Sequence, residues 1–302
     1  MQMSQMKESS ALIKLILMGF SGKGKSTALV PLAIPEIVKG FPGLKLRVLD
    51  YDGKFFEVAQ QNLSARRDRR IASRNRLTPI TQEQYDAALD NIDIEVLREK
   101  TKPNDQGGVS IIGQPQAWTN TQKALERWLR TADSQSVIAL DSWTHMTQTA
   151  LPAYCMALQN KSFNEFGNAP HGNDYMMPQK LSRNMLTLLA DTKCHVIVCC
   201  HQEAQDIKKK TGEFDTKADG SKEAVEEVVH SEMVPVSIGS KGRIAIPSQF
   251  NHILVAHADI DGGRYICTQP EDGVTTKTPF FARAEKNYPL DVALPKYWML
   301  GQ

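Results

Sequence analysis

A glycine-rich run near the start of the chain constrains its fold more than any other feature. Residues 19–27 read GFSGKGKST and match the pattern G-x-x-x-x-G-K-[ST] without a substitution. An apolar stretch over residues 11–18 precedes the run, and a helix-like stretch follows it. Glycines allow tight turns, so successive backbone N–H groups can point inward at phosphate oxygens. This context favours a strand, a phosphate-binding loop and a helix over a chance glycine turn.

The residue types within this run predict separate roles in binding ATP and Mg²⁺. The Lys25 ammonium would reach the β- and γ-phosphates, and the Ser26 hydroxyl would ligate Mg²⁺. The backbone of the whole run would surround the phosphates. The predicted cofactor-binding residues are therefore Gly19, Phe20, Ser21, Gly22, Lys23, Gly24, Lys25, Ser26 and Thr27.

A short apolar strand, predicted over residues 137–140, ends at Asp141. A P-loop site holds Mg²⁺ with a carboxylate at such a strand end, usually through water. Asp141 is therefore the predicted magnesium residue, although an Asp in this place also fits an ordinary turn. Ser142 follows it rather than Glu, so no adjacent carboxylate can activate water, and a catalytic base must come from elsewhere.

Two carboxylates follow the strand predicted over residues 44–49. Asp50 and Asp52 are two residues apart, and strand geometry would place both side chains on the same side. Either carboxylate could act as a general base that holds water in line with the γ-phosphate. A solvated turn at Asp52-Gly53 is the alternative. The spacing does not choose between the two acids.

The strand predicted over residues 195–200 ends in a polar pair that begins with His201. A hydrogen-bond donor there could sense the γ-phosphate, and the other interpretation is a histidine that caps a strand end. A zinc site formed by Cys194, Cys199, Cys200 and His201 is disfavoured. It lacks a second C-x-x-C half, and alternation along a strand splays these side chains.

The order of the predicted elements indicates the fold class. Strands that alternate with helices predict an α/β fold with a mainly parallel sheet. Residues 54–118 predict a helical insertion, with an amphipathic stripe over 84–98. Residues 1–10 predict a flexible tail, which leaves one domain over residues 11–302. Short β-like runs predict β-rich C-terminal additions at residues 243–246, 252–257, 263–268 and 279–283.

The composition excludes several classes of protein. The chain has 302 residues, of which 41% are hydrophobic, as in a globular protein with a sizeable core. Its 36 basic and 34 acidic residues give a net charge of +2, so nucleic-acid affinity would have to come from local patches. No apolar run reaches the ~18 residues of a membrane helix, and no signal peptide is predicted. The five cysteines are then expected to be reduced thiols in the cytoplasm.

The motifs GFSGKGKST, VLDYDGK, VIALDSWTHM and VIVCCHQEAQ together resemble those of the RecA-like ATPases. Within that class, the chain is similar to a phage-type family of small P-loop ATPases related to the Sak-type single-strand annealing proteins. The resemblance implies that Asp52 is the catalytic carboxylate, Asp141 the magnesium residue and His201 the sensor of the γ-phosphate. It departs from RecA itself in having Asp in place of the usual Glu. For a phage-encoded chain, the cytoplasm would be that of the host cell.

Basic segments outside the loop predict contact with nucleic acid. Residues 66–76 hold six arginines, and a polar loop predicted over residues 205–222 follows the sensor strand, where RecA-like proteins carry a DNA-binding loop. The loop predicted over residues 160–175 holds aromatic side chains, which suit single strands because bases stack on them. Solvated surface loops or an oligomer contact are the alternatives. The candidate residues are Arg66, Arg67, Arg69, Arg70, Lys208, Lys209 and Lys210.

These predictions together describe a slow or DNA-stimulated ATPase. We expect it to act as a homo-oligomer on single-stranded DNA in recombination or annealing, without a membrane. The alternative is a nucleotide-dependent switch or loader that acts on a protein partner, with the arginine segment as a docking arm. A small-molecule kinase is disfavoured because the sequence shows no lid motif or acceptor pocket.

Overall fold

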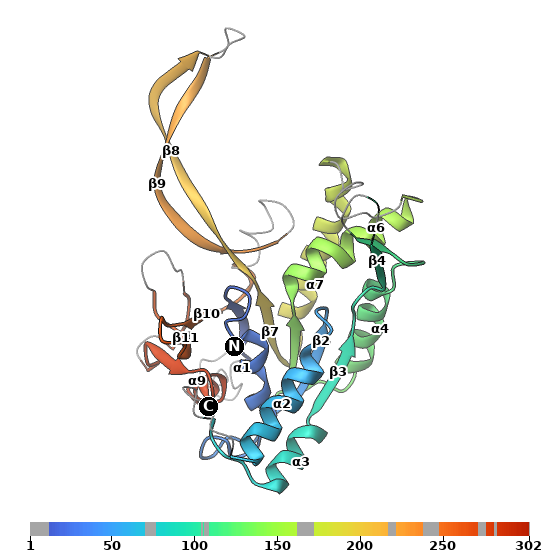
Figure 1. Ribbon diagram of the computed structural model, residues 1–302, viewed down its shortest axis with the longest axis vertical. Helices are drawn as coiled ribbons and strands as arrows, with labels where there is room; N and C mark the ends of the chain where they lie inside the picture. The colour runs from blue at the N-terminus through green and yellow to red at the C-terminus, as the bar shows by residue number, and fades with distance from the viewer. Residues whose placement is uncertain are drawn as a thin grey trace, which may run out of the picture.

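The computed structural model describes residues 12–69, 77–103, 105, 109–161, 172–216, 222–237, 248–270, 276–280 and 283–301. An eight-stranded sheet forms the centre of the body (Figure 1). Its strands run from β10 to β3 in parallel, and two antiparallel strands extend one edge. The order is β12 (Asn287–Pro289), β11 (Arg264–Cys267), β10 (His252–Ala258), β1 (Lys14–Met18), β7 (His195–Cys200), β6 (Ser136–Asp141), β2 (Lys45–Asp50) and β3 (Ile92–Val96).

Helices cover both faces of this sheet. One face packs against α1 (Lys25–Leu29), α2 (Phe55–Arg67), α3 (Gln82–Asp90) and α9 (Ala293–Met299). The other packs against α4 (Ala117–Leu129), α5 (Trp143–His145), α6 (Leu151–Leu158) and α7 (Met176–Ala190). A 3₁₀-helix (Val30–Ala33) extends α1, a π-helical turn (Met146–Ala150) joins α5 to α6, and a 3₁₀-helix (Gly172–Tyr175) precedes α7.

The central strands are apolar on both sides, which explains the two helical layers. In β1, Leu15 and Leu17 join the cluster that contains α1, whereas Ile16 and Met18 join the cluster that contains α7. Successive side chains of a strand point to opposite faces, and parallel strands covered on both faces therefore read as continuous apolar runs. The prediction of an α/β fold with a mainly parallel sheet, and with the glycine-rich loop between its first strand and first helix, is confirmed.

The segment over residues 54–118 is only partly helical. It contributes α2 and α3, but also the edge strand β3 and a small hairpin of β4 (Thr101–Pro103) and β5 (Val109–Ile111). The helical stripe predicted over 84–98 is wrong after Asp90, because β3 pairs with β2 there. Two members of that stripe, Leu89 and Val96, are exposed, so the helical spacing did not mark a buried face.

The predicted polar loop over residues 205–222 is instead mostly strand. β8 (Gln202–Thr216) and β9 (Lys222–Pro235) pair in antiparallel fashion and form a two-stranded ribbon that projects from the body (Figure 1). Residues 217–221 lie outside the described part of the chain. The sequence did not predict these strands because apolar alternation, the usual signal of a strand, is weak among so many charged residues.

The C-terminal third matches the β-rich prediction in β10 and β11. Of the run predicted at 279–283, the described residues 279, 280 and 283 lie in turns rather than in a strand. Nearby, Lys277 makes an isolated antiparallel bridge to Ile253, and the next described strand is β12. The predicted run at 243–246 and the tail at 1–10 lie outside the described residues. None of the helices described here combines the length and the apolar character needed to cross a membrane.

Candidate functional site

The glycine-rich run links β1 to α1, as its pattern predicts. Gly24 stands directly before α1 with a φ of 95°, and Gly22 has a φ of 75°. Side chains rarely tolerate such left-handed values. A Cβ atom on Gly24 would also lie 2.5 Å from Cδ2 of Leu290, so the end of that side chain would have to shift. The left-handed conformation thus favours glycine here, and the Leu290 side chain adds to the cost of any other residue.

Lys25 lies buried within the loop that it helps to form. Its Nζ donates hydrogen bonds to the carbonyl oxygens of Gly19 at 2.7 Å and Phe20 at 3.0 Å. Burial lowers the pKa of this lysine. The ammonium is therefore held at the loop by weak carbonyl acceptors, which a phosphate oxygen can replace with a stronger, charge-assisted bond.

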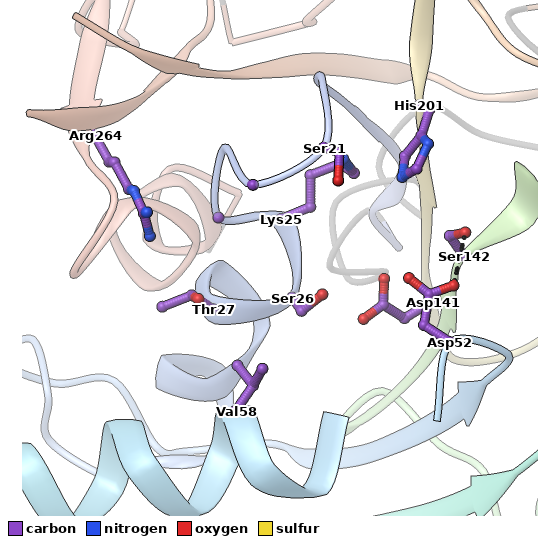
Figure 2. A pocket seen from close by; sticks show the side chains of 12 residues that line it. Ser21, Lys25, Ser26, Thr27, Asp52, Val58, Asp141, Ser142, His201 and Arg264 are labelled. Atoms are coloured by element: carbon purple, nitrogen blue, oxygen red, sulfur yellow. Dashed lines mark hydrogen bonds between the residues drawn. The ribbon is translucent and has the colours of Figure 1, made fainter. Parts of the chain in front are cut away.

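A pocket opens over the loop at the carboxyl ends of the central strands. Figure 2 shows Lys25 and Ser26 in its middle, Asp52 and Asp141 on one side and Arg264 on the other. Gly19, Phe20 and Lys23 of the predicted set are not among the lining residues. The lining residues are Ser21, Gly22, Gly24, Lys25, Ser26, Thr27, Asp52, Val58, Asp141, Ser142, His201 and Arg264.

Asp141 and Ser26 come together as the predicted magnesium pair. Asp141 ends β6, its carboxylate is buried, and it accepts a hydrogen bond from the Ser26 side chain. Burial, helped by the nearby Asp52 and Asp50, raises the pKa of Asp141 to about 7, while Ser26 and Lys25 oppose the shift. Carboxylate and hydroxyl oxygens are hard ligands that suit Mg²⁺. Crowded carboxylates beside a hydroxyl thus fit this cation.

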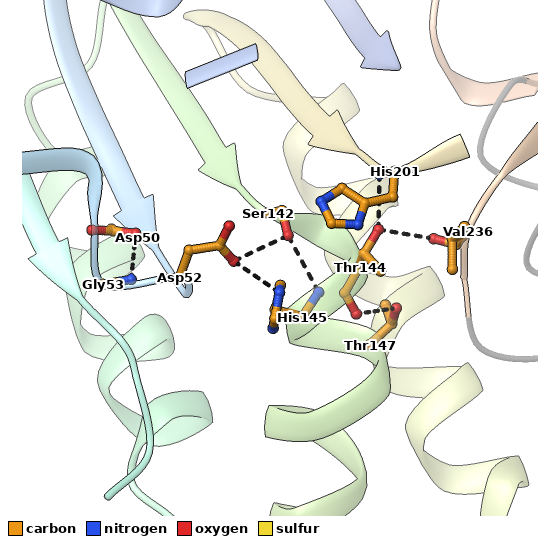
Figure 3. A network of polar contacts seen from close by, with 9 residues as sticks. All are labelled: Asp50, Asp52, Gly53, Ser142, Thr144, His145, Thr147, His201 and Val236. Atoms are coloured by element: carbon orange, nitrogen blue, oxygen red, sulfur yellow. Dashed lines mark hydrogen bonds and ion pairs between the residues drawn. The ribbon is translucent and has the colours of Figure 1, made fainter. Parts of the chain in front are cut away.

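The structure separates the two carboxylates that the sequence left as alternatives. Asp50 is buried, and its two oxygens accept the backbone N–H groups of Gly53 at 2.8 Å and Phe55 at 2.9 Å. Asp52 lies beyond the end of β2 and lines the pocket. Figure 3 shows the two side chains pointing in different directions, so the expectation that they share one side is wrong. The regular alternation stops where β2 ends.

Ser142 and His145, which both follow β6 in the chain, hold Asp52 in place (Figure 3). Oδ1 of Asp52 lies 3.4 Å from the Ser142 hydroxyl, which donates to it, and 3.3 Å from Nε2 of His145. The Ser142 hydroxyl also accepts the His145 backbone N–H at 3.4 Å, which caps α5. The peptide bond between Asp141 and Ser142 is cis. The sequence analysis missed His145, whose only signal was its place four residues after Asp141.

His201 lies at the junction between the pocket and the ribbon. Its side chain lines the pocket, and burial together with Lys25 lowers its pKa. Its backbone N–H donates to the Thr144 hydroxyl at 2.9 Å, and its carbonyl accepts the Val236 N–H at 2.8 Å. Hydrogen bonds therefore connect the predicted sensor position to α5, which follows β6, and to the end of the ribbon.

The candidate arginines for nucleic acid do not form one surface. Arg66 is buried: it donates to Asn62 at 2.7 Å and forms an ion pair with Asp291 at 2.6 Å. The prediction that Arg66 contacts nucleic acid is therefore wrong. Arg67 bonds Asp68 and stacks over the Tyr85 ring at 4.6 Å.

Arg69 is exposed, and Arg70 lies outside the described residues. Lys208, Lys209 and Lys210 lie in β8, where the backbone register places them opposite Val228, Glu227 and Glu226. The cysteines of the disfavoured zinc site are all buried, and no group of three or more potential ligands forms among the described residues.

Comparisons with known proteins add little to this description. No protein-family model matches the chain, and no curated protein matches it. Among solved structures, the chain is similar to a KaiC-like protein from the archaeon Pyrococcus horikoshii. The two are 12% identical, the match covers 92% of this chain and 84% of that chain, and the TM-score is 0.38. At this score the fold assignment depends on the strand order and the loop, and neither phage origin nor Sak-type kinship gains support.

Proposed function

We propose that this chain binds ATP with Mg²⁺ and hydrolyses it. One observation carries the proposal: the glycine-rich loop, the Ser26–Asp141 pair and the Asp52 carboxylate all line a single pocket. Helix N-termini and inward backbone N–H groups favour anions, and Lys25 adds a positive charge at the same place. The pocket thus combines a phosphate cradle, a cation site and a carboxylate in reach of them.

The side chains suggest how the reaction proceeds. Lys25 would exchange its bonds to Gly19 and Phe20 for bonds to the phosphates, and Ser26 and Asp141 would hold Mg²⁺. Bound Mg²⁺ supplies positive charge that offsets the charge on the β- and γ-phosphates. Asp52 takes a proton from water as the water oxygen bonds to the γ-phosphorus and the bond to the β–γ bridging oxygen breaks. ADP and phosphate are the products.

Ser142 and His145 support Asp52 in this role. Both lie near the same carboxylate oxygen, Oδ1. Fixing one oxygen leaves the other for the water and limits the rotation of the carboxylate. An Asp is shorter than the Glu expected from the resemblance, and a held carboxylate compensates for reach with defined orientation.

The test is binding and release of phosphate by the purified chain. We expect Mg-ATP to bind with a measurable heat by calorimetry and phosphate to appear slowly with Mg²⁺. Lys25→Ala should remove both, whereas Lys123→Ala, on the exposed face of α4, should keep both. Wild-type protein that is folded yet gives no Mg-ATP binding would contradict the proposal.

The partner of the chain is a separate proposal. We keep a homo-oligomer on single-stranded DNA as the first proposal, supported by exposed Arg69 and by the basic run 208–210. Replacement of Lys208, Lys209 and Lys210 by Ala should flatten the dependence of log K on log salt by about 2, since each contact contributes about 0.7. Light scattering in the presence of Mg-ATP tests the oligomer.

A nucleotide-dependent switch that acts on a protein partner is the second proposal. The observation that favours it is the bonded path from pocket to ribbon through His201, Thr144 and Val236. Wild-type protein without affinity for single-stranded DNA at low salt, and without stimulation of its ATPase by DNA, would favour the switch. Strong stimulation would favour the DNA proposal.

A further inference from the structure

We infer that Arg264 binds the α-phosphate of the nucleotide, at the end of the pocket that faces the nucleoside. The inference deepens the proposed function and rests on it. Arg264 lines the same pocket as the loop but carries no motif, and none of the roles above uses it. It would supply a positive charge that the phosphate-binding loop lacks at this end.

The strand order fixes which end of the pocket Arg264 occupies. Asp141 ends β6, which lies two strands from β1 on the β7 side. Arg264 begins β11, which lies two strands from β1 on the opposite side. Figure 2 shows the same arrangement, with Arg264 and the acidic pair separated by the loop. The γ-phosphate belongs at the acidic side, where the cation and the base are. The α-phosphate and the nucleoside therefore extend toward β11.

Local packing holds the Arg264 stem beside the start of α1. A Cβ atom on Gly24 would lie 3.5 Å from the Cδ atom of Arg264, so the stem runs next to the last glycine of the loop. The Arg264 carbonyl accepts the N–H of Leu290 at 3.0 Å, and its backbone is opposite Ala258 in the ladder with β10. Both partners fix where the side chain leaves the strand, while the residue as a whole stays exposed.

The size and charge of the pocket indicate the ligand group. The cavity volume of about 250 Å³ is below the about 300–1,000 Å³ common for whole small-molecule sites. It suits the phosphates, with the nucleoside beyond the rim. Mg²⁺ and Lys25 neutralise mainly the β- and γ-phosphates. The α-phosphate is the anionic group left nearest to Arg264, and guanidinium binds phosphate with paired, charge-assisted bonds.

The test compares three ligands and three variants. Calorimetry would measure the affinity of Mg-ATP, Mg-ADP and magnesium tripolyphosphate for wild type, Arg264→Ala and Arg264→Lys. Arg130→Ala, an exposed arginine at the end of α4, is the matched control. We expect Arg264→Ala to weaken all three ligands by about tenfold, as loss of an exposed charged hydrogen bond would do. Arg264→Lys should recover most of the loss, because it keeps the charge.

Each other outcome has a distinct meaning. Equal affinity of wild type and Arg264→Ala for Mg-ATP would overturn the inference. Weaker ATP and ADP with unchanged tripolyphosphate would also overturn it, because the contact would then be to the base or sugar. If Arg264→Ala does not fold, Arg264→Gln takes its place against Arg264→Lys with the same expectations. A folded wild type that binds none of the three ligands would instead reject the proposed function.

Discussion

The phosphate pocket and the ribbon meet at His201 but are held in different ways. The pocket stands on strands buried on both faces, and backbone contacts such as Tyr51 N–H to Asp141 O at 2.7 Å fix its strand ends. The ribbon leaves the body as two strands paired with each other. A lone two-stranded ribbon is marginal in water, whereas a packed sheet is rigid. The residues that need accurate geometry thus lie in the packed body, whereas the arrangement of the ribbon is free to change.

The two regions also differ in charge. Residues 202–235 contain nine acidic residues and five lysines, a net charge of −4 in a chain of +2 overall. The register places Lys209 and Lys210 opposite Glu227 and Glu226. Opposite charges across a ladder offset each other. The register thus sets two of the three lysines of the basic run opposite acidic residues of the partner strand, and this pairing bears directly on the DNA proposal.

The largest expected effect comes from the loop itself. Gly24→Ala introduces a Cβ at a φ of 95° and 2.5 Å from Cδ2 of Leu290, so the loop must take a strained conformation or change its backbone, and the Leu290 side chain must shift. We expect nucleotide affinity to fall by at least a hundredfold, measured by calorimetry. Gly262→Ala, which also has a positive φ but no atom within 4 Å of its Cβ, is the control and should leave the affinity near wild type. Equal affinities of the two variants would break the distinction between pocket and periphery.

Acid should destabilise the body by an intermediate amount. His195 and His252 are buried, and burial lowers the pKa of each to about 4. Nδ1 of His195 accepts the N–H of Ile13 at 2.9 Å, so protonation there breaks a bond. In the unfolded chain these histidines bind protons near pH 6.5. Their contribution to the free energy of unfolding is therefore fully present above that pH and is lost as the pH falls from 6.5 to 4.

We expect the loss to be about 1–2 kcal/mol per histidine by pH 5, measured by urea unfolding at a series of pH values. His195→Gln should remove part of the pH dependence, although it also costs stability at pH 7. A free energy that stays level from pH 7 to pH 4.5 would show that these histidines are not neutral in the folded body.

The smallest effect should come from shortening the ribbon. Replacing residues 207–230 by Asn-Gly joins Asp206 to Ser231, which face each other in the register, through a two-residue hairpin turn. The affinity for Mg-ATP and the midpoint of thermal unfolding should stay near wild type, because the pocket lies in the body. Loss of nucleotide binding in a folded, shortened chain would show that the ribbon supports the pocket.

The sequence could predict the parts of the site that depend on local spacing. The loop from Gly19 to Thr27 and the strand ending at Asp141 were both identified, because each combines an apolar strand with a required residue type. The roles of Asp50 and Asp52 could not be separated, since spacing does not show where a strand stops and a turn begins. Their different hydrogen bonds in the structure support Asp52 as the proposed base.

Long-range contacts explain the remaining differences. Arg66 looked like part of a charged surface, yet its partner Asp291 is 225 residues away and buries it. Arg264 was missed because a lone arginine at the start of a strand carries no pattern. The ribbon was missed because its strands are rich in charged residues and show little apolar alternation. In each case the deciding contact comes from distant chain or from a partner strand.

The most direct test of the account compares the two neighbouring carboxylates. Single-turnover hydrolysis of Mg-ATP would be measured for Asp52→Asn and Asp50→Asn, with the affinity for Mg-ATP measured in parallel. Asp52→Asn should keep affinity and lose about 10²–10⁴ in rate. Asp50→Asn should keep the rate but lose about 1–3 kcal/mol of folding stability, because one of two buried backbone N–H groups loses its acceptor. Normal turnover by Asp52→Asn, with turnover lost in a folded Asp50→Asn, would contradict the assignment of the base.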